Sequence, residues 1–173
     1  FAPPCREAGH VSVGPSPESI RAMGDKAAAK RLMQAAGVPC IPGYQAGNEG
    51  NAQDADMLLR EAQAIGWPVM IKAVAGGGGR GMRLVEGPAD FAALLQSAQS
   101  EALHAFGNGT VLLERAVLAP RHIEIQVMAD RHGNAIHLGE RDCSMQRRHQ
   151  KIIEEGPSPA VSPELRRRMG EAA

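Results

Sequence analysis

The chain has 173 residues, the size of one ordinary domain, and its 19 basic residues balance 19 acidic ones. A net charge of zero argues against attraction of the whole surface to nucleic acid or anionic lipid, which needs a basic excess. An apolar content of 43% argues against disorder, and no run of 18 apolar residues predicts a membrane-spanning helix.

Residues that typically start or end helices mark the predicted elements in the first half of the chain. Ser16 and Asp25 are good N-cap residues, and Pro17 suits the first position of a helix. Gly37 and Gly66 are typical of helix ends. The predicted elements are, in chain order, the end of a strand at His10–Val13, a helix from Pro17 to about Met23, a helix opened by Asp25 and ended by Gly37, a loop at residues 43–53, and a helix with Leu58, Ala62 and Ile65 on one face.

The second half mixes strands with helices. The predicted elements are a buried strand at Val69–Ile71 with Lys72 at its end, a glycine loop at residues 75–81, a returning strand at Met82–Val85, a helix from Pro88, strands at Thr110–Glu114 and Ile123–Val127, a turn at Arg131–Asn134, a strand at Ala135–Leu138, and a helix capped by Ser162. The alternation at Ile123–Val127 predicts one buried and one polar face. Because the strands return as hairpins, we predict an α+β fold with antiparallel sheets carrying helices on one side.

The glycine loop is a candidate phosphate site. Gly76, Gly78 and Gly81 fit the G-x-G-x-x-G spacing, but a strand is predicted to follow, so a dinucleotide-binding fold is rejected. A P-loop is also absent, because no Gly-Lys-Ser/Thr occurs. Successive glycine N–H groups can still turn inward around an anion, and Lys72 could reach the same phosphate. The alternative is a flexible surface turn.

The basic residues are fifteen Arg and only four Lys, at positions 26, 30, 72 and 151. Lysine is a compact point charge suited to phosphate, so each of the four is of interest. Residues 140–151 hold five basic groups, which fit a pocket wall for anions, a solvated face or a nucleic-acid patch, although missing aromatics weaken the last. On pattern alone, His122 is a structural histidine and Cys143 a small buried hydrophobe. The remaining histidines lack metal-ligand spacing, so no metal site is predicted.

Five motifs occur in an order that resembles one enzyme family. They are Met-Gly-Asp-Lys at 23–26, Met-Ile-Lys-Ala at 70–73, Gly-Gly-Gly-Gly-Arg-Gly-Met at 76–82, Pro-Arg-His-Ile-Glu-Ile-Gln-Val at 120–127, and the long, specific run from Glu140 to Lys151. Together they resemble biotin carboxylase, the ATP-grasp component of biotin-dependent carboxylases. The resemblance implies that ATP and Mg²⁺ serve to phosphorylate bicarbonate, and that carboxyphosphate then delivers its carboxyl group to N1′ of biotin on a carrier protein.

The resemblance also implies domains and residue roles. The end of an N-terminal α/β domain would occupy residues 1–40, a lid 41–116, and the start of a C-terminal domain 117–173. The implied roles are ATP phosphate binding by Lys26 and Lys72, lid N–H groups at Gly77, Gly78 and Gly79, an adenine-reading hinge at Glu114, Arg115, Ala116 and Val117, nucleotide contacts at His122, Gln146 and His149, and a bicarbonate contact at Lys151. Arg115 stands where relatives often have Lys, but a backbone contact would survive that change.

The chain begins without Met and ends inside a helical pattern, so we expect an internal fragment. The resemblance places the magnesium-binding carboxylates beyond Ala173, so we do not expect the fragment alone to turn over ATP. Expected partners are bicarbonate, a biotin carboxyl carrier, a carboxyltransferase and a second copy of the full-length protein, but neither nucleic acid nor membrane. Three distant cysteines indicate a reducing cytoplasm. The alternatives are another ATP-grasp ligase such as carbamoyl-phosphate synthetase, or a non-catalytic nucleotide-binding module.

Overall fold

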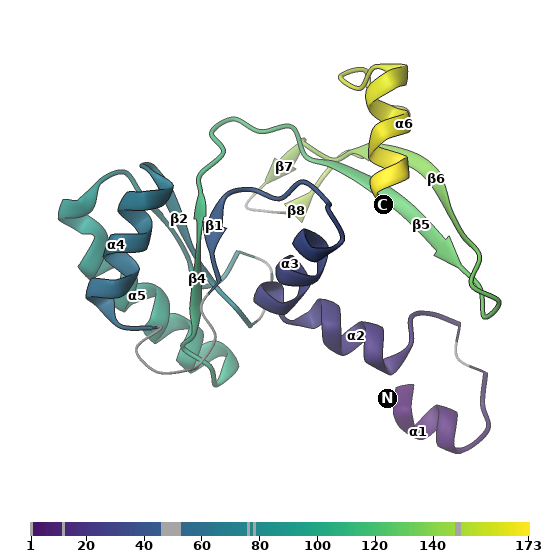
Figure 1. Cartoon of the computed structure of the whole chain (residues 1–173), viewed down its shortest axis with the longest axis horizontal. Coiled ribbons are helices and arrows are strands. Elements are labelled where there is room, and N and C mark those ends of the chain that lie inside the picture. The colour runs from purple at the N-terminus through teal and green to yellow at the C-terminus, as the bar shows by residue number, and fades with distance from the viewer. Residues whose placement is uncertain (1, 12, 46–52, 76, 78, 148–149) are drawn as a thin grey trace. The chain divides into compact units, whose positions relative to one another are not determined.

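The computed structural model describes residues 2–11, 13–45, 53–75, 77, 79–147 and 150–173 (Figure 1). The chain forms two compact units, Phe1–Ala116 and Val117–Ala173. Among the described helices, none combines the length and apolar character needed to cross a bilayer.

Three helices open the first unit: α1 (Ala2–Glu7), α2 (Pro17–Gly24) and α3 (Lys26–Ala35). Both predicted caps are confirmed. The Ser16 hydroxyl accepts a hydrogen bond from the Ser19 N–H at 3.1 Å, and Asp25 accepts from the N–H groups of Ala27 and Ala28 at 2.8 and 3.0 Å. The strand predicted at His10–Val13 is wrong for the described residues 10, 11 and 13, because none of them has a strand partner.

The first unit contains a four-stranded antiparallel sheet with the order β1-β4-β2-β3. Its strands are β1 (Gly43–Tyr44), β2 (Val69–Ala73), β3 (Met82–Val85) and β4 (Val111–Arg115). The loop predicted at 43–53 is therefore wrong at its start, where Gly43 and Tyr44 pair with Glu114 and Leu113; residues 46–52 lie outside the described part. Glycine is required at position 43, because a Cβ there would collide with the Leu113 carbonyl oxygen.

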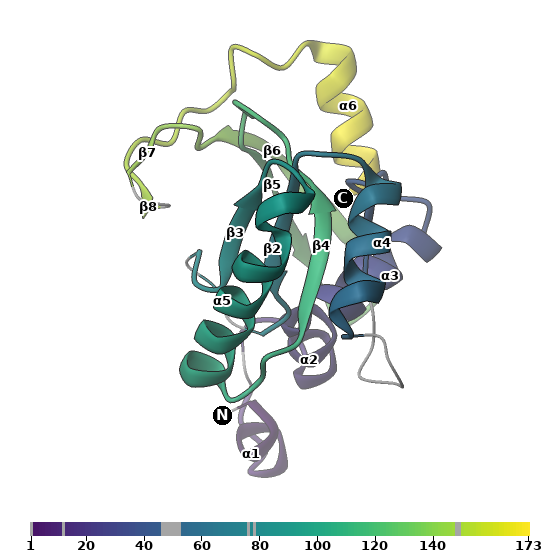
Figure 2. The same cartoon turned by 90° about the vertical axis from the view of Figure 1, so that its left-hand side faces the viewer.

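The main core lies between this sheet and two helices, α4 (Ala55–Ile65) and α5 (Pro88–Phe106), which run side by side (Figures 1 and 2). The fully buried side chains here are Leu58, Ala62, Val69, Ile71, Val85, Phe91, Leu95, Ala98, Val111 and Leu113. The prediction of helices on one side of the sheet is confirmed for α4 and α5. It is wrong for α3, because Ala27 of that helix packs against Val74 and Leu112 in a second, smaller cluster.

The β2–β3 hairpin carries the glycine loop. The Ala73 N–H donates to the Gly81 carbonyl at 2.9 Å, which closes the hairpin. Gly81 is buried with a φ of +66°, and a Cβ there would lie 2.8 Å from the Ala73 Cβ, so only glycine fits. Gly77 is exposed and Gly79 has a φ of +78°. Gly76 and Gly78 lie outside the described residues.

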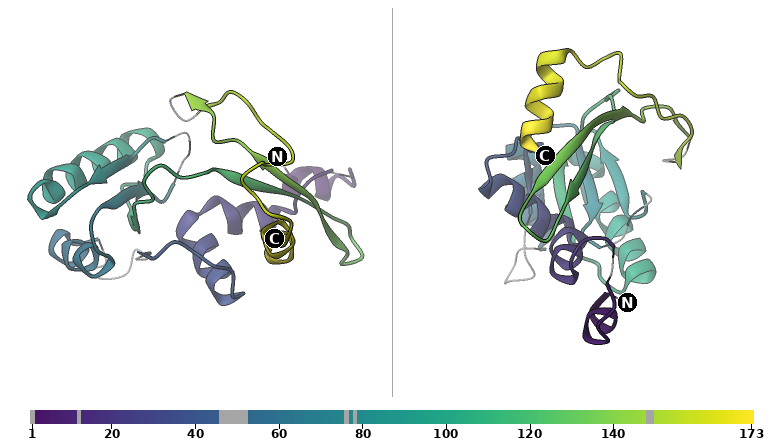
Figure 3. Two further views of the ribbon diagram at one scale, coloured as in Figure 1. Left: turned by 90° about the horizontal axis from the view of Figure 1, so that it is seen from above. Right: turned by 90° about the vertical axis from the view of Figure 1, so that its right-hand side faces the viewer.

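The second unit is a hairpin of β5 (Ile123–Ala129) and β6 (Ala135–Asp142), followed by the short pair β7 (Gln146–Arg147) and β8 (Gln150–Lys151). Helix α6 (Pro163–Ala172), capped by Ser162 as predicted, packs against β6 (Figure 3). The predicted buried face of the strand at 123–127 is wrong. Ile123 and Ile125 are half-buried and Val127 is exposed, because β5 and β6 form a sheet of only two strands.

Candidate functional site

The first unit has a lysine-rich pocket on the sheet face opposite the main core. Helix α3 contributes Lys26 and Lys30, which share a face because they are four residues apart. In β2 and β4 alternate side chains point to opposite faces, so Lys72 and Glu114 point away from buried Ile71 and Leu113. Lys72 pairs with Leu112, and Met70 with Glu114. Lys72 and Glu114 are therefore diagonal neighbours across the two strands.

Glu114 is shared by two lysines in this pocket. One carboxylate oxygen, Oε1, accepts a hydrogen bond from the Lys30 Nζ at 2.8 Å, and Oε2 accepts from the Lys72 Nζ. Burial opposes the charged form of Glu114, but the hydrogen bonds from the two ammonium groups outweigh it, so the pKa of Glu114 lies below its ordinary value. Glu114 is therefore a carboxylate, held on both oxygens.

Lys26 lies beside this pair. Its Nζ donates to the carbonyl oxygens of Ala73 and Val74 at 3.2 and 3.3 Å, at the end of β2. Burial and the nearby Lys72 lower the pKa of Lys26. Together with Cys40, Ile41 and Leu112, the four charged residues line a pocket of about 260 Å³. Three ammonium groups and one carboxylate give the pocket a net positive charge, and Ile41 and Leu112 give it an apolar wall. This combination suits a ligand that joins an apolar group to an anion.

The predicted adenine-reading hinge spans the boundary between the two units, with Glu114, Arg115 and Ala116 in the first and Val117 in the second. Glu114 and Arg115 end β4, where the N–H groups of Arg115 and Ala116 donate to the carbonyls of Pro42 and Pro68, each at 2.9 Å. These two N–H groups are therefore used within the fold. The Arg115 side chain donates to the Ile65 carbonyl at 2.7 Å and does not line the pocket. Val117 is the first residue of the other unit.

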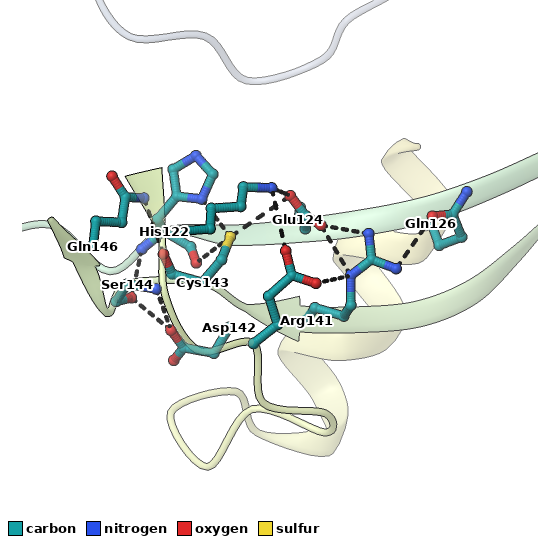
Figure 4. Close-up of polar contacts among 10 residues, drawn as sticks. His122, Glu124, Gln126, Arg141, Asp142, Cys143, Ser144 and Gln146 are labelled. Atoms are coloured by element: carbon teal, nitrogen blue, oxygen red, sulfur yellow. Dashed lines mark hydrogen bonds and ion pairs between the residues drawn. The ribbon is translucent and has the colours of Figure 1, made fainter. Parts of the chain in front are cut away.

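A second charged cluster lies at the end of the β5–β6 hairpin (Figure 4). Glu124 of β5 accepts hydrogen bonds from the guanidinium of Arg141, with Nε at 2.9 Å, and from the Nζ of Lys151 on β8. Glu154 lies 3.4 Å from the Arg141 Nε and 3.8 Å from the Lys151 Nζ. The hydrogen bonds from Lys151 and Arg141 hold the pKa of Glu124 at about 2. Lys151, the predicted bicarbonate contact, is thus fixed by two carboxylates.

Cys143 and His122 adjoin this cluster (Figure 4). The Sγ of Cys143 lies 2.6 Å from the His122 Nδ1 and 3.6 Å from a Glu124 oxygen. Cys143 is fully buried, as predicted, and burial raises the pKa of its thiol. The three donor atoms are close enough to share a metal ion. Because Glu124 already neutralises two cations and the thiol is kept protonated, we interpret the group as an ion-pair cluster and assign no metal to it.

Asp142 orders the loop that presents these side chains. Its Oδ1 accepts hydrogen bonds from the Ser144 N–H at 3.0 Å and hydroxyl at 2.6 Å, and these bonds lower the pKa of Asp142. The Ser144 Oγ in turn accepts from the His122 N–H at 2.8 Å. Gln146 donates from Nε2 to the Cys143 carbonyl at 2.9 Å. Asp142 and Ser144 therefore link His122, directly before β5, to the loop between β6 and β7, and Gln146 at the start of β7 bonds to the same loop.

The structure groups the predicted site residues within each unit. It brings Lys26, Lys72 and Glu114 together in the first unit, and His122, Gln146 and Lys151 near one another in the second. Gly78 and His149 lie outside the described residues. Among the residues predicted from sequence, Lys30 was noted only as one of four scarce lysines, and Glu124 was not singled out. The four-residue spacing from Lys26 could have placed Lys30 in the pocket, and the polar face of the alternating strand could have indicated Glu124.

Comparison with known proteins identifies the class. The family description "Carbamoyl-phosphate synthase L chain, ATP binding domain" matches residues 25–173. The crystal structure of the biotin carboxylase–β,γ-ATP complex from Campylobacter jejuni superposes with a TM-score of 0.92 and 49% identity, over 99% of this chain and 38% of that chain. The chain therefore belongs to this family of ATP-binding domains, and the predicted α+β ATP-grasp fold is confirmed.

Within this family the chain is similar to a segment of biotin carboxylases, as the sequence resemblance predicted. It is 57% identical over all 173 residues to biotin carboxylase 1, chloroplastic, of Populus trichocarpa, and covers 32% of that protein. It is 54% identical to methylcrotonoyl-CoA carboxylase subunit alpha, mitochondrial, of Oryza sativa subsp. japonica, of which it covers 23%. The biotin carboxylase domain dimer of Hydrogenobacter thermophilus 2-oxoglutarate carboxylase, in complex with MgADP, ADP and bicarbonate, has a TM-score of 0.92 and 45% identity over 99% of this chain and 37% of that chain. The chain thus spans about a third of the length of the first relatives it matches.

Proposed function

We propose that the full-length protein carboxylates carrier-bound biotin with bicarbonate and ATP, as part of an acyl-CoA carboxylase. In the first step the γ-phosphoryl group of ATP moves to an oxygen of bicarbonate, which gives ADP and carboxyphosphate. In the second step the carboxyl group replaces the proton on N1′ of biotin and inorganic phosphate leaves. Both steps develop negative charge on phosphate oxygens, so fixed positive groups are the principal requirement.

The lysine-rich pocket is the observation that carries this proposal. Burial and the nearby Lys72 together lower the Lys26 pKa, and a like-charged pair of this kind favours an anion between its members. We assign both to the phosphates of ATP, with Gly77, Gly78 and Gly79 as lid donors, and the hinge from Glu114 to Val117 to the adenine. His122, Gln146 and His149 are proposed nucleotide contacts, and Lys151 the bicarbonate contact. In this scheme residues 1–40, 41–116 and 117–173 are the three ATP-grasp parts expected from the sequence.

Magnesium would neutralise the phosphates of bound ATP. Mg²⁺ prefers carboxylate and water oxygens. In the described part of the chain, however, Glu114 and Glu124 are each shared by two cations, and Glu140 accepts two hydrogen bonds from Arg166 at 2.8 Å. These donors do not fit a magnesium site. We propose that the magnesium ligands come from outside these 173 residues.

The proposed partners follow from the same reaction. They are a biotin carboxyl carrier, a carboxyltransferase and a second copy of the full-length protein, and a relative, the Hydrogenobacter thermophilus domain, is a dimer. We also propose a reducing compartment, because Cys5, Cys40 and Cys143 are free thiols. The cytoplasm expected from the sequence is one such compartment, whereas relatives carry chloroplastic and mitochondrial names.

The test is an assay of ADP release by the full-length protein. We expect ADP release to require bicarbonate and to rise with biotinylated carrier. Lys72→Met should raise the ATP dissociation constant by about tenfold, because one charge-assisted hydrogen bond to phosphate is lost. Ammonia-dependent formation of carbamoyl phosphate would instead support the carbamoyl-phosphate synthetase alternative. ATP binding without bicarbonate-dependent cleavage would support a non-catalytic module.

A further inference from the structure

We propose that Lys30 is a positioning residue for the nucleotide: it holds Glu114, so that Lys72 can leave Glu114 and turn to a phosphate. This inference rests on the proposed function. Residue-by-residue resemblance gave Lys30 no role. The supporting observation is that the Glu114 carboxylate accepts hydrogen bonds from both the Lys30 and the Lys72 ammonium groups.

The two lysines on Glu114 differ in their access to solvent. The side chain of Lys30 is 9% exposed and that of Glu114 is 12% exposed, so their 2.8 Å contact is an interior ion pair. The side chain of Lys72 is 27% exposed, which places it at the open side of the pocket. An incoming phosphate would therefore meet Lys72 before Lys30. Lys72 is the partner that can move, and Lys30 is the one that stays.

The need for a second partner follows from the burial of Glu114. Breaking a buried ion pair is costly when one charge is left without a partner. If Glu114 had only Lys72, a phosphate would have to remove the sole counter-ion of a nearly buried carboxylate. With Lys30 on the other oxygen, Glu114 keeps one charged hydrogen bond after Lys72 departs. Lys30 thereby lowers the cost of releasing Lys72 to the ligand.

The local fold fixes Lys30 in this place. The Asp25 cap starts α3 directly before Lys26, and Lys30 follows one turn later on the same face. Across the sheet, Gly43 leaves room for the ammonium group, because a Cβ at position 43 would lie 2.9 Å from the Lys30 Nζ. Arg31, the next residue on α3, is exposed and reaches the Gln45 carbonyl at 3.4 Å instead. It is a matched control with the same charge on the same helix.

The experiment measures binding of ATP and ADP to the full-length protein by calorimetry, and kcat and KM for ATP. Lys30→Met keeps the length of the side chain and removes its charge. We expect it to weaken nucleotide binding by about tenfold and to change kcat at saturating ATP less than twofold. Lys30→Arg should restore most of the affinity, and Arg31→Met should change it less than twofold. Thermal unfolding of each variant verifies that it is folded. If Lys30→Met does not fold, Lys30→Arg still measures how nucleotide affinity depends on the group that holds Glu114.

A double-mutant cycle with Glu114→Gln tests whether Lys30 acts through Glu114. In the Glu114→Gln background, Lys30→Met should change nucleotide affinity less than twofold, because there is no carboxylate left to hold. An undiminished tenfold loss in that background would mean that Lys30 touches the ligand directly and would overturn the inference. An unchanged affinity in Lys30→Met alone would also overturn it. If Lys30→Met left the affinity unchanged but Lys72→Met still weakened nucleotide binding, only the role of Lys30 would fail and the proposed function would stand. If neither variant weakened binding, the role of Lys30 and the proposed function would both fail.

Discussion

Replacing Phe91 with alanine would test the two-faced architecture of the first sheet. The side chain is 1% exposed and belongs to the main core, and its ring meets that of Trp67 edge-on with centroids 6.0 Å apart. Transfer of a buried Phe side chain to water costs about 1.5–3 kcal/mol, and the cavity left in a packed core adds to that. We therefore expect Phe91→Ala to destabilise this unit by about 3–5 kcal/mol.

Urea unfolding with tryptophan fluorescence measures this loss. With a slope of about 2 kcal/mol per molar urea, the transition of this unit should move down by about 2 M. Leu103→Ala on the same helix is the control, because Leu103 is 55% exposed, and it should change stability by less than about 0.5 kcal/mol.

The second measurement is nucleotide affinity in the absence of urea. Phe91 lies on the core face of the sheet, whereas Lys72 and Glu114 lie on the opposite face. While the variant remains folded, its affinity for ADP should stay within twofold of wild type. A large loss of affinity without a loss of stability, or equal destabilisation by the Phe91 and Leu103 variants, would refute the assignment of the two faces.

Two further predictions concern the second unit. Glu124→Gln should accelerate amide hydrogen exchange in residues 122–127 several-fold, because two cations lose their shared carboxylate, whereas Glu171→Gln, which removes an exposed pair with Arg167, should change exchange little. The pKa of Glu124 is about 2 in the folded protein, below its ordinary value of 4.5. The stabilisation from its ion pairs is therefore complete above about pH 4.5 and is lost as the pH falls towards 2. A difference in exchange rate between wild type and Glu124→Gln that did not shrink over that range would contradict the ion-pair geometry. Buried, protonated Cys143 should react with iodoacetamide more slowly than half-buried Cys40 in the native protein, and peptide mass spectrometry should find the two rates converging in urea; equal native rates would contradict the burial.

Local signals predicted most of the helices and strands. Ser16, Asp25 and Ser162 cap helices as expected, because capping depends on residues within one turn. The strand predicted at Val69–Ile71 is confirmed as part of β2, and Val69 and Ile71 are buried because the sheet and two helices enclose that face. The alternation in β5 gave a wrong prediction of burial. That pattern reports only which side chains share a face, and among the described strands β5 pairs with β6 alone.

The sites were harder to predict than the elements. Lys30 meets Glu114 across 84 residues of chain, and Glu124 meets Lys151 across 27. No local period relates such residues, because the contacts depend on strand order and register. Resemblance to biotin carboxylase supplied Lys26, Lys72 and Lys151, but it gave Glu114 only as a hinge residue and gave Glu124 no role. The ion pairs of these two carboxylates follow from the geometry.

The scarcity of lysine has a practical consequence for chemical labelling. All four lysines of these 173 residues lie in the two charged clusters, and each donates to a carboxylate or a carbonyl oxygen. An amine-selective reagent will therefore modify this segment only at those clusters, without a background of surface amines. The fifteen arginines supply protease cleavage sites on either side of each lysine. Acylation footprinting with and without nucleotide would thus record the occupancy of each cluster in a single digest.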